Sequence, residues 1–442
     1  MASLSLRRFA GVNCMTFNRY LATSPATNPS KSYKLLIVGG GTGGTATANR
    51  LTRILGAGNV AVIEPSDVHY YQPLFTLVGG GIKQLDQSAR PTKSVLPKSC
   101  DWIQDYAVKF DPDNNTVTTG NGTQLKYDYL VVAMGLSLRY DKVPGLVEAL
   151  KSDPSVCSNY SPQYVNKTFK AIQQFKDGNA IFTFPNTPIK CAGAPQKIMY
   201  LTEEHLRKAG KRDKANIMLN TSLGVIFGVK KYADALWKVV ESRGMNVNLR
   251  QNLIEVRHET KEAIFELLDS KDKETVTYKY EMLHAVPPMS PPDVLLSSPL
   301  VDATGYVDVN KNTLQHNKYQ NVFGIGDCTS IPTSKTAAAV ASQTAYLQKS
   351  IKSVMAGKQP DSKYDGYTSC PLVTARGKCI MAEFDFDSQP LETFPFNQAK
   401  ERWSMYLMKA EGFLRVYYWM LLPGIWNGPA FIRKLLRFGM SK

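Results

Sequence analysis

The chain has 442 residues, a hydrophobic fraction of 43% and a net charge of +16. This length predicts two or three domains, and the composition argues against a disordered chain. Its seven cysteines show no regular spacing, which argues against a secreted disulfide framework or a zinc module. The positive charge by itself fits a nucleic-acid partner, an anionic membrane or a mitochondrial protein equally well.

The first thirty residues are basic, rich in serine and free of acidic residues. They contain Arg7, Arg8 and Arg19, whereas the first acidic residue of the chain is Glu64. They also lack the long apolar segment of a secretory signal. We therefore expect a mitochondrial presequence over residues 1–30, with a disordered basic tail as the alternative.

An apolar, strand-like segment over residues 34–40 leads directly into a glycine-rich turn and a helix-like segment. Gly39, Gly41 and Gly44 have the GxGxxG spacing, which allows a tight turn, close approach of the backbone to a pyrophosphate and close packing of helix on strand. A second apolar strand ends in Glu64, whose carboxylate can accept the ribose hydroxyls. These features predict a dinucleotide site.

Two later segments indicate that the nucleotide is FAD. The strand over residues 127–135 resembles the ATG segment of flavoprotein reductases, and residues 318–327 resemble their second FAD motif, in which Asp327 would meet the ribityl and pyrophosphate region. A helix that starts at Thr336 would point its positive end, reinforced by Lys335, toward the flavin ring. The alternative for Lys335 is a solvated lysine at a helix start.

An FAD domain of this type is interrupted by a second domain. We predict an α/β protein with tandem Rossmann-like dinucleotide-binding domains of the disulfide oxidoreductase type. The FAD domain is expected over residues 33–144 and 294–357, and the second domain over 145–293. The remaining residues, 358–442, are expected to form a C-terminal region with a redox cysteine and membrane-interface helices.

The second domain has a strand over residues 179–185, but no glycine fingerprint follows it. The loop contains three prolines, which have no backbone N–H to offer a phosphate. We therefore expect a reducing partner other than NAD(P)H. Cys191 lies at the centre of this loop, and Lys190 and Lys197 would favour its thiolate form.

Three segments of the chain resemble matching segments of the mitochondrial sulfide:quinone oxidoreductase family. They are FPNTPIKCAGAPQKIMYL (184–201), GIGDCTSIPTSKTAAAVASQ (324–343) and KYDGYTSCPLVTARGKCIMAEFDF (363–386). The likeness extends from about Lys34 to the C-terminus. It implies that Cys191 and Cys370 form the redox pair. By this resemblance, sulfide converts Cys370 to a persulfide, and Cys191 is released as the thiolate that engages the flavin.

The resemblance also implies the partners and the location. Ubiquinone would reoxidise the flavin, glutathione or sulfite would accept the persulfide sulfur, and the enzyme would be peripheral to the mitochondrial inner membrane, with a homo-oligomer as one option. Lys409 would contact the flavin or quinone region, although a snorkelling interfacial lysine explains it equally well. The residues expected to contact FAD are Gly39, Gly41, Gly43, Gly44, Glu64, Gln72, Val108, Lys197, Asp327, Lys335 and Lys409.

The last forty residues are rich in aromatic and basic residues. Apolar side chains recur at helical spacing between Trp403 and Leu421, and Pro423 then ends that helix. A second helix starting near Pro429 is expected to place basic residues on the face opposite its apolar one, near anionic lipid; the apolar residues are Phe431, Ile432, Leu435 and Leu436, and the basic ones Arg433, Lys434 and Arg437. No apolar run is long enough to span a bilayer, so these helices should lie at a membrane surface, with core packing as the alternative.

Several other readings compete with this one. Cys379 is the rival of Cys370, but its alternating, strand-like segment predicts a packed side chain. Histidines are few and scattered, so we expect no metal. The closest alternative function is a type II NADH:quinone dehydrogenase, which the missing second GxGxxG disfavours. A DNA-binding flavoprotein is also disfavoured, because the charge is spread along the chain without a nucleic-acid module.

Overall fold

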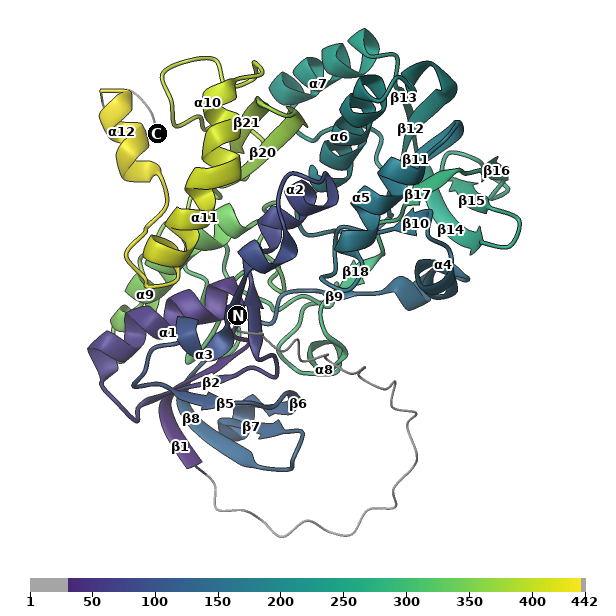
Figure 1. The fold of residues 1–442 in the computed structure, drawn as a ribbon. Coiled ribbons are helices and arrows are strands. Elements are labelled where there is room, and N and C mark those ends of the chain that lie inside the picture. The colour runs from purple at the N-terminus through teal and green to yellow at the C-terminus, as the bar shows by residue number, and fades with distance from the viewer. Residues whose placement is uncertain (1–30, 439–442) are drawn as a thin grey trace, which may run out of the picture.

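The computed structural model describes residues 31–438, and the expected presequence lies outside this range. Two α/β units lie next to each other, and the C-terminal strands and helices pack beside both of them (Figure 1). The fold is that of tandem Rossmann-like domains, as the sequence predicts.

The first unit is built on a seven-stranded sheet. Its strand order is β5-β2-β1-β8-β7-β6, and β19 pairs with β8 as a branch. These strands are β1 (Lys31–Val38), β2 (Val60–Ile63), β5 (Asp101–Ile103), β6 (Ala107–Asp111), β7 (Thr116–Thr119), β8 (Gln124–Val132) and β19 (Val322–Gly324). The contacts of β1 with β2 and β8, and of β8 with β19, are parallel. Strand β19 follows the second unit in the sequence, so the first sheet contains strands from both sides of that inserted unit.

The second unit has a five-stranded parallel sheet in the order β10-β17-β11-β12-β13. Its strands are β10 (Val156–Cys157), β11 (Gly178–Phe184), β12 (Ala215–Thr221), β13 (Asn246–Leu249) and β17 (Met282–His284). An antiparallel sheet of β14 (Gln251–Arg257), β15 (Glu262–Leu267) and β16 (Thr275–Lys279) flanks it. Two short strands of the crossovers, β9 (Ser137–Leu138) and β18 (Met289–Ser290), pair with each other.

The helices cover these sheets and extend to the C-terminus. Those before the C-terminal region are α1 (Thr42–Leu55), α2 (Phe75–Gly79), α3 (Thr92–Val95), α4 (Leu146–Ser152), α5 (Val165–Gln174), α6 (Ala194–Lys208), α7 (Lys230–Ser242), α8 (Asp293–Leu296) and α9 (Ala337–Met355). A further antiparallel pair, β3 (Val68–Tyr70) and β4 (Ala89–Pro91), lies beside the first sheet. Helix α9 begins where the sequence predicts, with the side chain of Thr336 accepting a hydrogen bond from the N–H of Ala339.

The C-terminal region starts with the antiparallel pair β20 (Thr368–Ala375) and β21 (Lys378–Phe384). A helical stretch follows as α10 (Trp403–Leu407), a π-helical turn (Met408–Gly412), α11 (Phe413–Val416) and a second π-helical turn (Tyr417–Leu421), and α12 (Ala430–Leu436) comes after it. Both predicted helices are confirmed. The expected place of Arg433 is wrong: it is only 2% exposed, because it turns inward over the ring of Tyr367 and toward Asp365.

One hydrophobic core joins the second unit to the C-terminal region. It contains side chains of α2, α6, β11, β20, β21 and the helical stretch after Trp403. A separate core lies around the first sheet and α9. The C-terminal region is therefore packed into the body of the protein along one side. Several large hydrophobic side chains on its other side are exposed.

Candidate active site

The glycine turn after β1 has the geometry that a dinucleotide requires. Gly39 has a φ of +100°, and a Cβ on Gly44 would lie 1.8 Å from the carbonyl oxygen of Gly39, so neither position tolerates a side chain. A Cβ on Gly41 would meet nothing within 4 Å. Glu64 accepts a hydrogen bond from the N–H of Gly40 at 2.7 Å. The turn and the carboxylate therefore face one open space.

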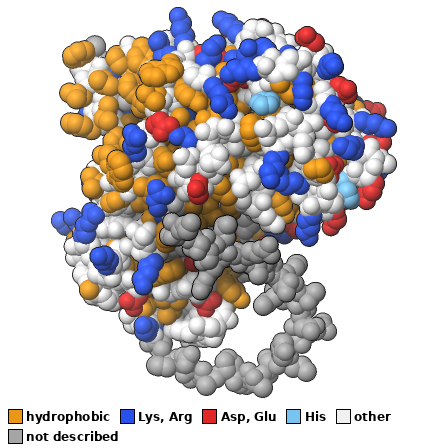
Figure 2. Space-filling view, viewed as in Figure 1, with side chains coloured by type: hydrophobic (Ala, Val, Ile, Leu, Met, Phe, Trp, Pro, Cys, Tyr) orange, Lys and Arg blue, Asp and Glu red, His pale blue; other side chains and the backbone are white. Residues whose placement is uncertain are grey.

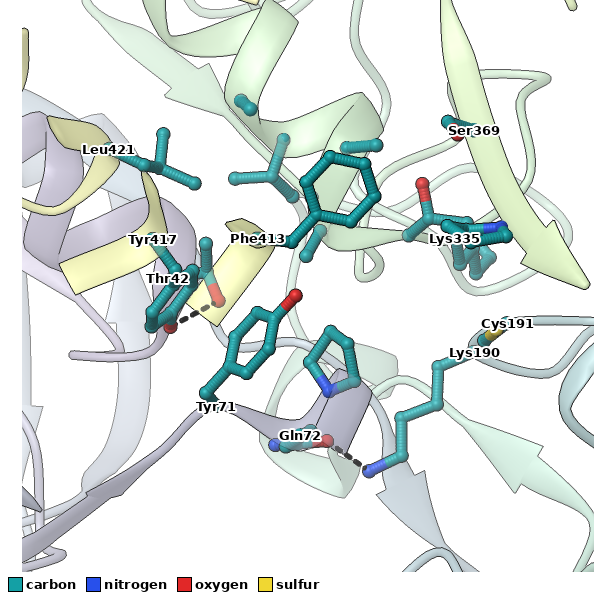
Figure 3. Close-up of a pocket in the computed structure, with 18 of the residues that line it drawn as sticks. Thr42, Tyr71, Gln72, Lys190, Cys191, Lys335, Ser369, Phe413, Tyr417 and Leu421 are labelled. Carbon is teal, nitrogen blue, oxygen red and sulfur yellow. Dashed lines mark hydrogen bonds between the residues drawn. The ribbon is translucent and has the colours of Figure 1, made fainter. Parts of the chain in front are cut away.

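That space is a cavity of about 650 Å³ that is lined by all three parts of the chain. Figure 3 shows Tyr71 and Gln72 from the first unit, Cys191 and Lys190 from the second, and Ser369, Phe413 and Tyr417 from the C-terminal region around it. The predicted residues that line this cavity are Gly39, Gly41, Gly43, Glu64, Gln72, Cys191, Lys197, Asp327, Lys335 and Lys409. Sequence positions far apart thus converge on one site.

Two predicted cofactor residues lie outside the cavity lining. Gly44 lies between α1 and β1 and not on the cavity surface, and its lack of a side chain lets the helix approach the strand closely. Val108 lies on β6, its side chain is 45% exposed, and it does not reach the cavity. Contact of Val108 with the cofactor therefore stays a prediction.

Cys191 and Cys370 are brought together by the fold. Their Sγ atoms are 3.9 Å apart, and both residues are free thiols in this structure. Cys191 has a φ of 54°, a conformation that side chains rarely adopt, and its N–H donates to the carbonyl of Lys335 at 2.8 Å. Gly193 makes the approach possible, because a Cβ there would lie 2.5 Å from the Sγ of Cys370.

Charge and hydrogen bonding favour a thiolate at Cys191. The hydrogen bond from Cys370, together with the charges of Lys197 and Lys409, lowers the pKa of Cys191 well below its ordinary value despite burial. The Nζ of Lys197 lies 3.3 Å from the Cys191 Sγ. The hydrogen bond to Cys191, followed by burial, raises the pKa of Cys370 well above its ordinary value. One sulfur is therefore prepared as a nucleophile and the other as its proton-bearing partner.

The two lysines predicted to act on Cys191 have different roles. Lys197 contacts the thiol as expected, and although burial alone would lower the pKa of Lys197, the Cys191 charge raises it. Lys190 instead donates to the Oε1 of Gln72 at 2.7 Å, a bond drawn in Figure 3. Burial lowers the pKa of Lys190 to about 8. Lys190 thus bridges the two units at the cavity.

Lys335 and Lys409 are buried cations at the same cavity. The Nζ of Lys335 donates to the carbonyl of Thr329 and lies over the ring of Tyr306, and burial lowers its pKa. The Nζ of Lys409 donates to the carbonyl of Pro73 at 2.6 Å, and burial lowers its pKa to about 8. Since Lys409 is 2% exposed, the snorkelling alternative is wrong.

Several residues of the site have no motif that would reveal them. Tyr160 directs its hydroxyl toward the carbonyl of Cys191 at 3.5 Å, and Asn159 beside it also lines the cavity. Tyr367, which directly precedes β20, and Glu383 of β21 form part of the wall. By contrast, Cys379 is fully buried in β21, as the alternating pattern predicts. None of the described residues, 31–438, form a cluster of three or more His, Cys, Asp or Glu that could hold a metal.

The residues present fit a dinucleotide. Helix α1 begins at the glycine turn without a side-chain cap and without an acidic residue in its first turn, so its N–H groups are available to a phosphate. Glu64 lies at the position where a ribose would be held. The start of α9, with Lys335 before it, completes the positive lining near Asp327.

Comparison with known proteins agrees with this geometry. The model of the pyridine nucleotide-disulphide oxidoreductase family matches residues 33–172. The chain is 56% identical to mitochondrial sulfide:quinone oxidoreductase of Mus musculus over 95% of this chain and 93% of that protein. It is 45% identical to the protein of that name from Dictyostelium discoideum, over 89% and 87% of the two chains.

A solved structure supports the same fold. The sulfide:quinone oxidoreductase of Aquifex aeolicus superposes with a TM-score of 0.76 at 21% identity, and the match covers 93% of this chain and 96% of that one. The family also carries a flavin cofactor, for which the lining described above is suited. On the strength of the full-length likeness to the mouse and Dictyostelium proteins, this chain belongs to the mitochondrial sulfide:quinone oxidoreductase family.

Proposed function

We propose that this protein oxidises sulfide at the Cys191 and Cys370 pair and passes the electrons through FAD to ubiquinone. The observation that carries the proposal is the thiol of Cys191, which lines the cavity and lies 3.9 Å from Cys370 and 3.3 Å from Lys197. No residue arrangement of this kind is needed to bind a nucleotide alone. It is suited to thiol and disulfide exchange.

The first step is an exchange at the oxidised pair. Closing the disulfide shortens the present sulfur separation to about 2 Å. Hydrosulfide then attacks the Cys370 sulfur, forms a new S–S bond and breaks the bond to Cys191, which leaves as a thiolate. Lys197 and Lys409 stabilise that leaving thiolate by charge. The products are a persulfide on Cys370 and an anionic Cys191 facing the cavity.

The second step removes an electron pair from Cys191. When bound, FAD supplies a two-electron acceptor that a quinone can reoxidise. The chain holds Cys191 for this transfer through its backbone bond to Lys335 and its contact with Lys197. A small thiol such as glutathione, or sulfite, attacks the outer sulfur of the persulfide. Cys370 leaves as a thiolate and rejoins the oxidised Cys191 as the disulfide.

The C-terminal helices are suited to a membrane surface that carries the quinone. Hydrophobic side chains gather over α10 to α12 at the upper left of Figure 2. They include Trp403, Leu407, Trp419, Phe431, Leu435 and Phe438, all of them exposed. Within residues 31–438, no helix is long and apolar enough to cross a bilayer. We propose peripheral attachment to the mitochondrial inner membrane, with the quinone entering beside these helices.

The rival function, a type II NADH:quinone dehydrogenase, is disfavoured by the loop after β11. That loop runs through two prolines and the strained Cys191 before α6, where a nicotinamide site needs glycines and free N–H groups. Failure of NADH to bleach the flavin, beside rapid bleaching by sulfide, is the expected discrimination.

An anaerobic titration tests the proposal. Sulfide is added to the holoenzyme and to the Cys191→Ser and Cys370→Ser variants while the flavin absorbance is followed, and a soluble ubiquinone is added afterwards. Bleaching and then recovery are expected in the wild type, and bleaching is expected to be lost in both variants. Cys100→Ser, which alters a cysteine outside the cavity lining, is the matched control. Bleaching at the wild-type rate in either cavity variant would refute the assignment.

A further inference from the structure

A buried carboxylate lies in the part of the cavity wall formed by β20 and β21. Glu383 is 4% exposed and lines the cavity together with Tyr367 and Ser369. Its oxygens accept hydrogen bonds from the Tyr367 hydroxyl at 2.5 Å, the Thr393 hydroxyl at 2.9 Å, the Thr393 N–H at 2.7 Å and the Gln398 amide at 2.8 Å. These donors fix both the carboxylate and the phenol of Tyr367 in one orientation.

Ser369 carries a hydroxyl next to this arrangement, and this hydroxyl donates to a weak acceptor. Its side chain contacts the phenol of Tyr367 and donates to the sulfur of Met381 at 3.6 Å. A thioether sulfur is a weak acceptor, so a better acceptor in the cavity would take this hydrogen. Burial and the charge of Glu383 raise the pKa of Tyr367 well above its ordinary value. The phenol therefore stays protonated and keeps donating to Glu383.

Much of the cavity wall formed by the C-terminal region is apolar. Around Ser369 and Tyr367, the C-terminal region lines the cavity with Pro371, Phe394, Met408, Phe413, Val416 and Leu421. A hydroxyl donor among largely apolar side chains, with the Lys409 cation in the same cavity, suits a flat, apolar ring that carries acceptor oxygens and no donors. A quinone ring has this chemistry, and its isoprenoid chain would lie along the apolar tail helices.

We propose that the Ser369 hydroxyl donates a hydrogen bond to a carbonyl oxygen of the quinone, and that Tyr367 and Glu383 act as positioning residues for that hydroxyl. The inference rests on the proposed quinone acceptor. Neighbouring residues of a strand point to opposite faces, so Cys370 faces Cys191 while Ser369 faces the cavity. Adjacent residues of β20 thus contribute to the two half-reactions separately, which lets a variant affect one without the other.

Equilibrium binding provides a test without turnover. A short-chain ubiquinone is titrated into the oxidised holoenzyme, and quenching of tryptophan fluorescence is followed, since Trp426 lines the cavity. Ser369→Ala is expected to weaken binding about threefold to tenfold, the value of one neutral hydrogen bond. The rate of flavin bleaching by sulfide is expected to stay within twofold of the wild type. Ser404→Ala, which alters an exposed serine of α10, is the control.

Two further variants separate the hydroxyl from general packing. Ser369→Thr keeps the hydroxyl and should bind quinone within twofold of the wild type. Tyr367→Phe removes one donor from Glu383 and frees the Ser369 hydroxyl to turn, so it should raise the KM for quinone with little change in kcat. Unchanged affinity in Ser369→Ala, or equal loss in the threonine and alanine variants, would overturn the inference. A wild type that binds no quinone would instead overturn the proposed function itself.

Discussion

The Sγ atoms of Cys191 and Cys370 lie 3.9 Å apart although 179 residues separate them in the chain. Cys191 reaches this position from the loop after β11, held by its N–H bond to Lys335, and Cys370 reaches it from β20. The contact therefore requires the second unit, the return of the chain to the first sheet and the C-terminal hairpin to be assembled together. A change at this contact should lower the rate of sulfide oxidation more strongly than it lowers the stability of the fold.

Gly193 is a site for such a change. Its φ of −84° is open to any residue, so a substitution causes no backbone strain. The added Cβ of Gly193→Ala would nevertheless lie 2.5 Å from the Cys370 Sγ and 2.6 Å from Leu372. We expect the two sulfurs to be pushed apart and the rate of flavin reduction by sulfide to fall at least about tenfold, at a stability cost of roughly 1–3 kcal/mol. Gly228→Ala, where a Cβ meets nothing within 4 Å, should change neither.

Lys197 should control the reactivity of Cys191. Replacing it by methionine removes a charge 3.3 Å from the sulfur, so the pKa of Cys191 should rise and less thiolate should be present at pH 7. We expect alkylation of Cys191 by iodoacetamide in the reduced enzyme to slow by roughly tenfold, and its pH profile to move to higher pH. Lys208→Met alters an exposed lysine of the same helix and is the control. An unmoved pH profile would contradict the role of Lys197.

The charge of Lys409 should lower the stability of the folded protein at neutral pH. Burial lowers its pKa to about 8 in the folded protein, whereas the unfolded chain keeps the ordinary value near 10.5. Below pH 8 the folded state must therefore carry a poorly solvated charge, and this penalty disappears as pH rises from about 8 to 10.5. Lys409→Met should raise the free energy of unfolding at pH 7, by up to about 3 kcal/mol.

The pH dependence distinguishes this effect from better packing alone. Urea unfolding of the wild type and Lys409→Met at pH 7 and at pH 10 should show the stability difference shrinking at the higher pH. Lys400→Met changes an exposed lysine and should show no such difference. A difference that is equal at both pH values would contradict the charge penalty. The variant should also alkylate Cys191 more slowly, since Lys409 helps to lower its pKa.

The elements that the sequence predicted well are those with a local cause. The glycine turn after β1, the carboxylate of Glu64 and the start of α9 each follow from the needs of a few neighbouring residues. The loop of Cys191 was found because a cysteine replaced an expected glycine fingerprint. The contact of Cys191 with Cys370 came from resemblance, since no local pattern brings two such distant segments together.

The errors and omissions share the opposite cause. Arg433 has the spacing of a solvated residue, yet the ring of Tyr367 and the carboxylate of Asp365 receive it inside the protein. Helical periodicity cannot reveal such a partner, because it lies 66 residues away in sequence on another element. Glu383 was missed for the same reason: its donors come from Tyr367, just before β20, and from the segment after β21.

The exposed face of α12 should determine attachment to membranes. Phe431 is 77% exposed and Leu435 is 65% exposed, and the basic Lys434 lies exposed between them. Burying each apolar side chain in a bilayer interface contributes roughly 1.5–3 kcal/mol, so the double variant Phe431→Ser with Leu435→Ser should bind anionic lipid vesicles at least about a hundredfold more weakly in sedimentation assays. Flavin bleaching by sulfide should be unchanged, because the inward contacts of Arg433 remain. Leu296→Ser, an exposed leucine on α8, is the control. Equal vesicle binding by the double variant and this control would show that a different surface of the protein faces the membrane.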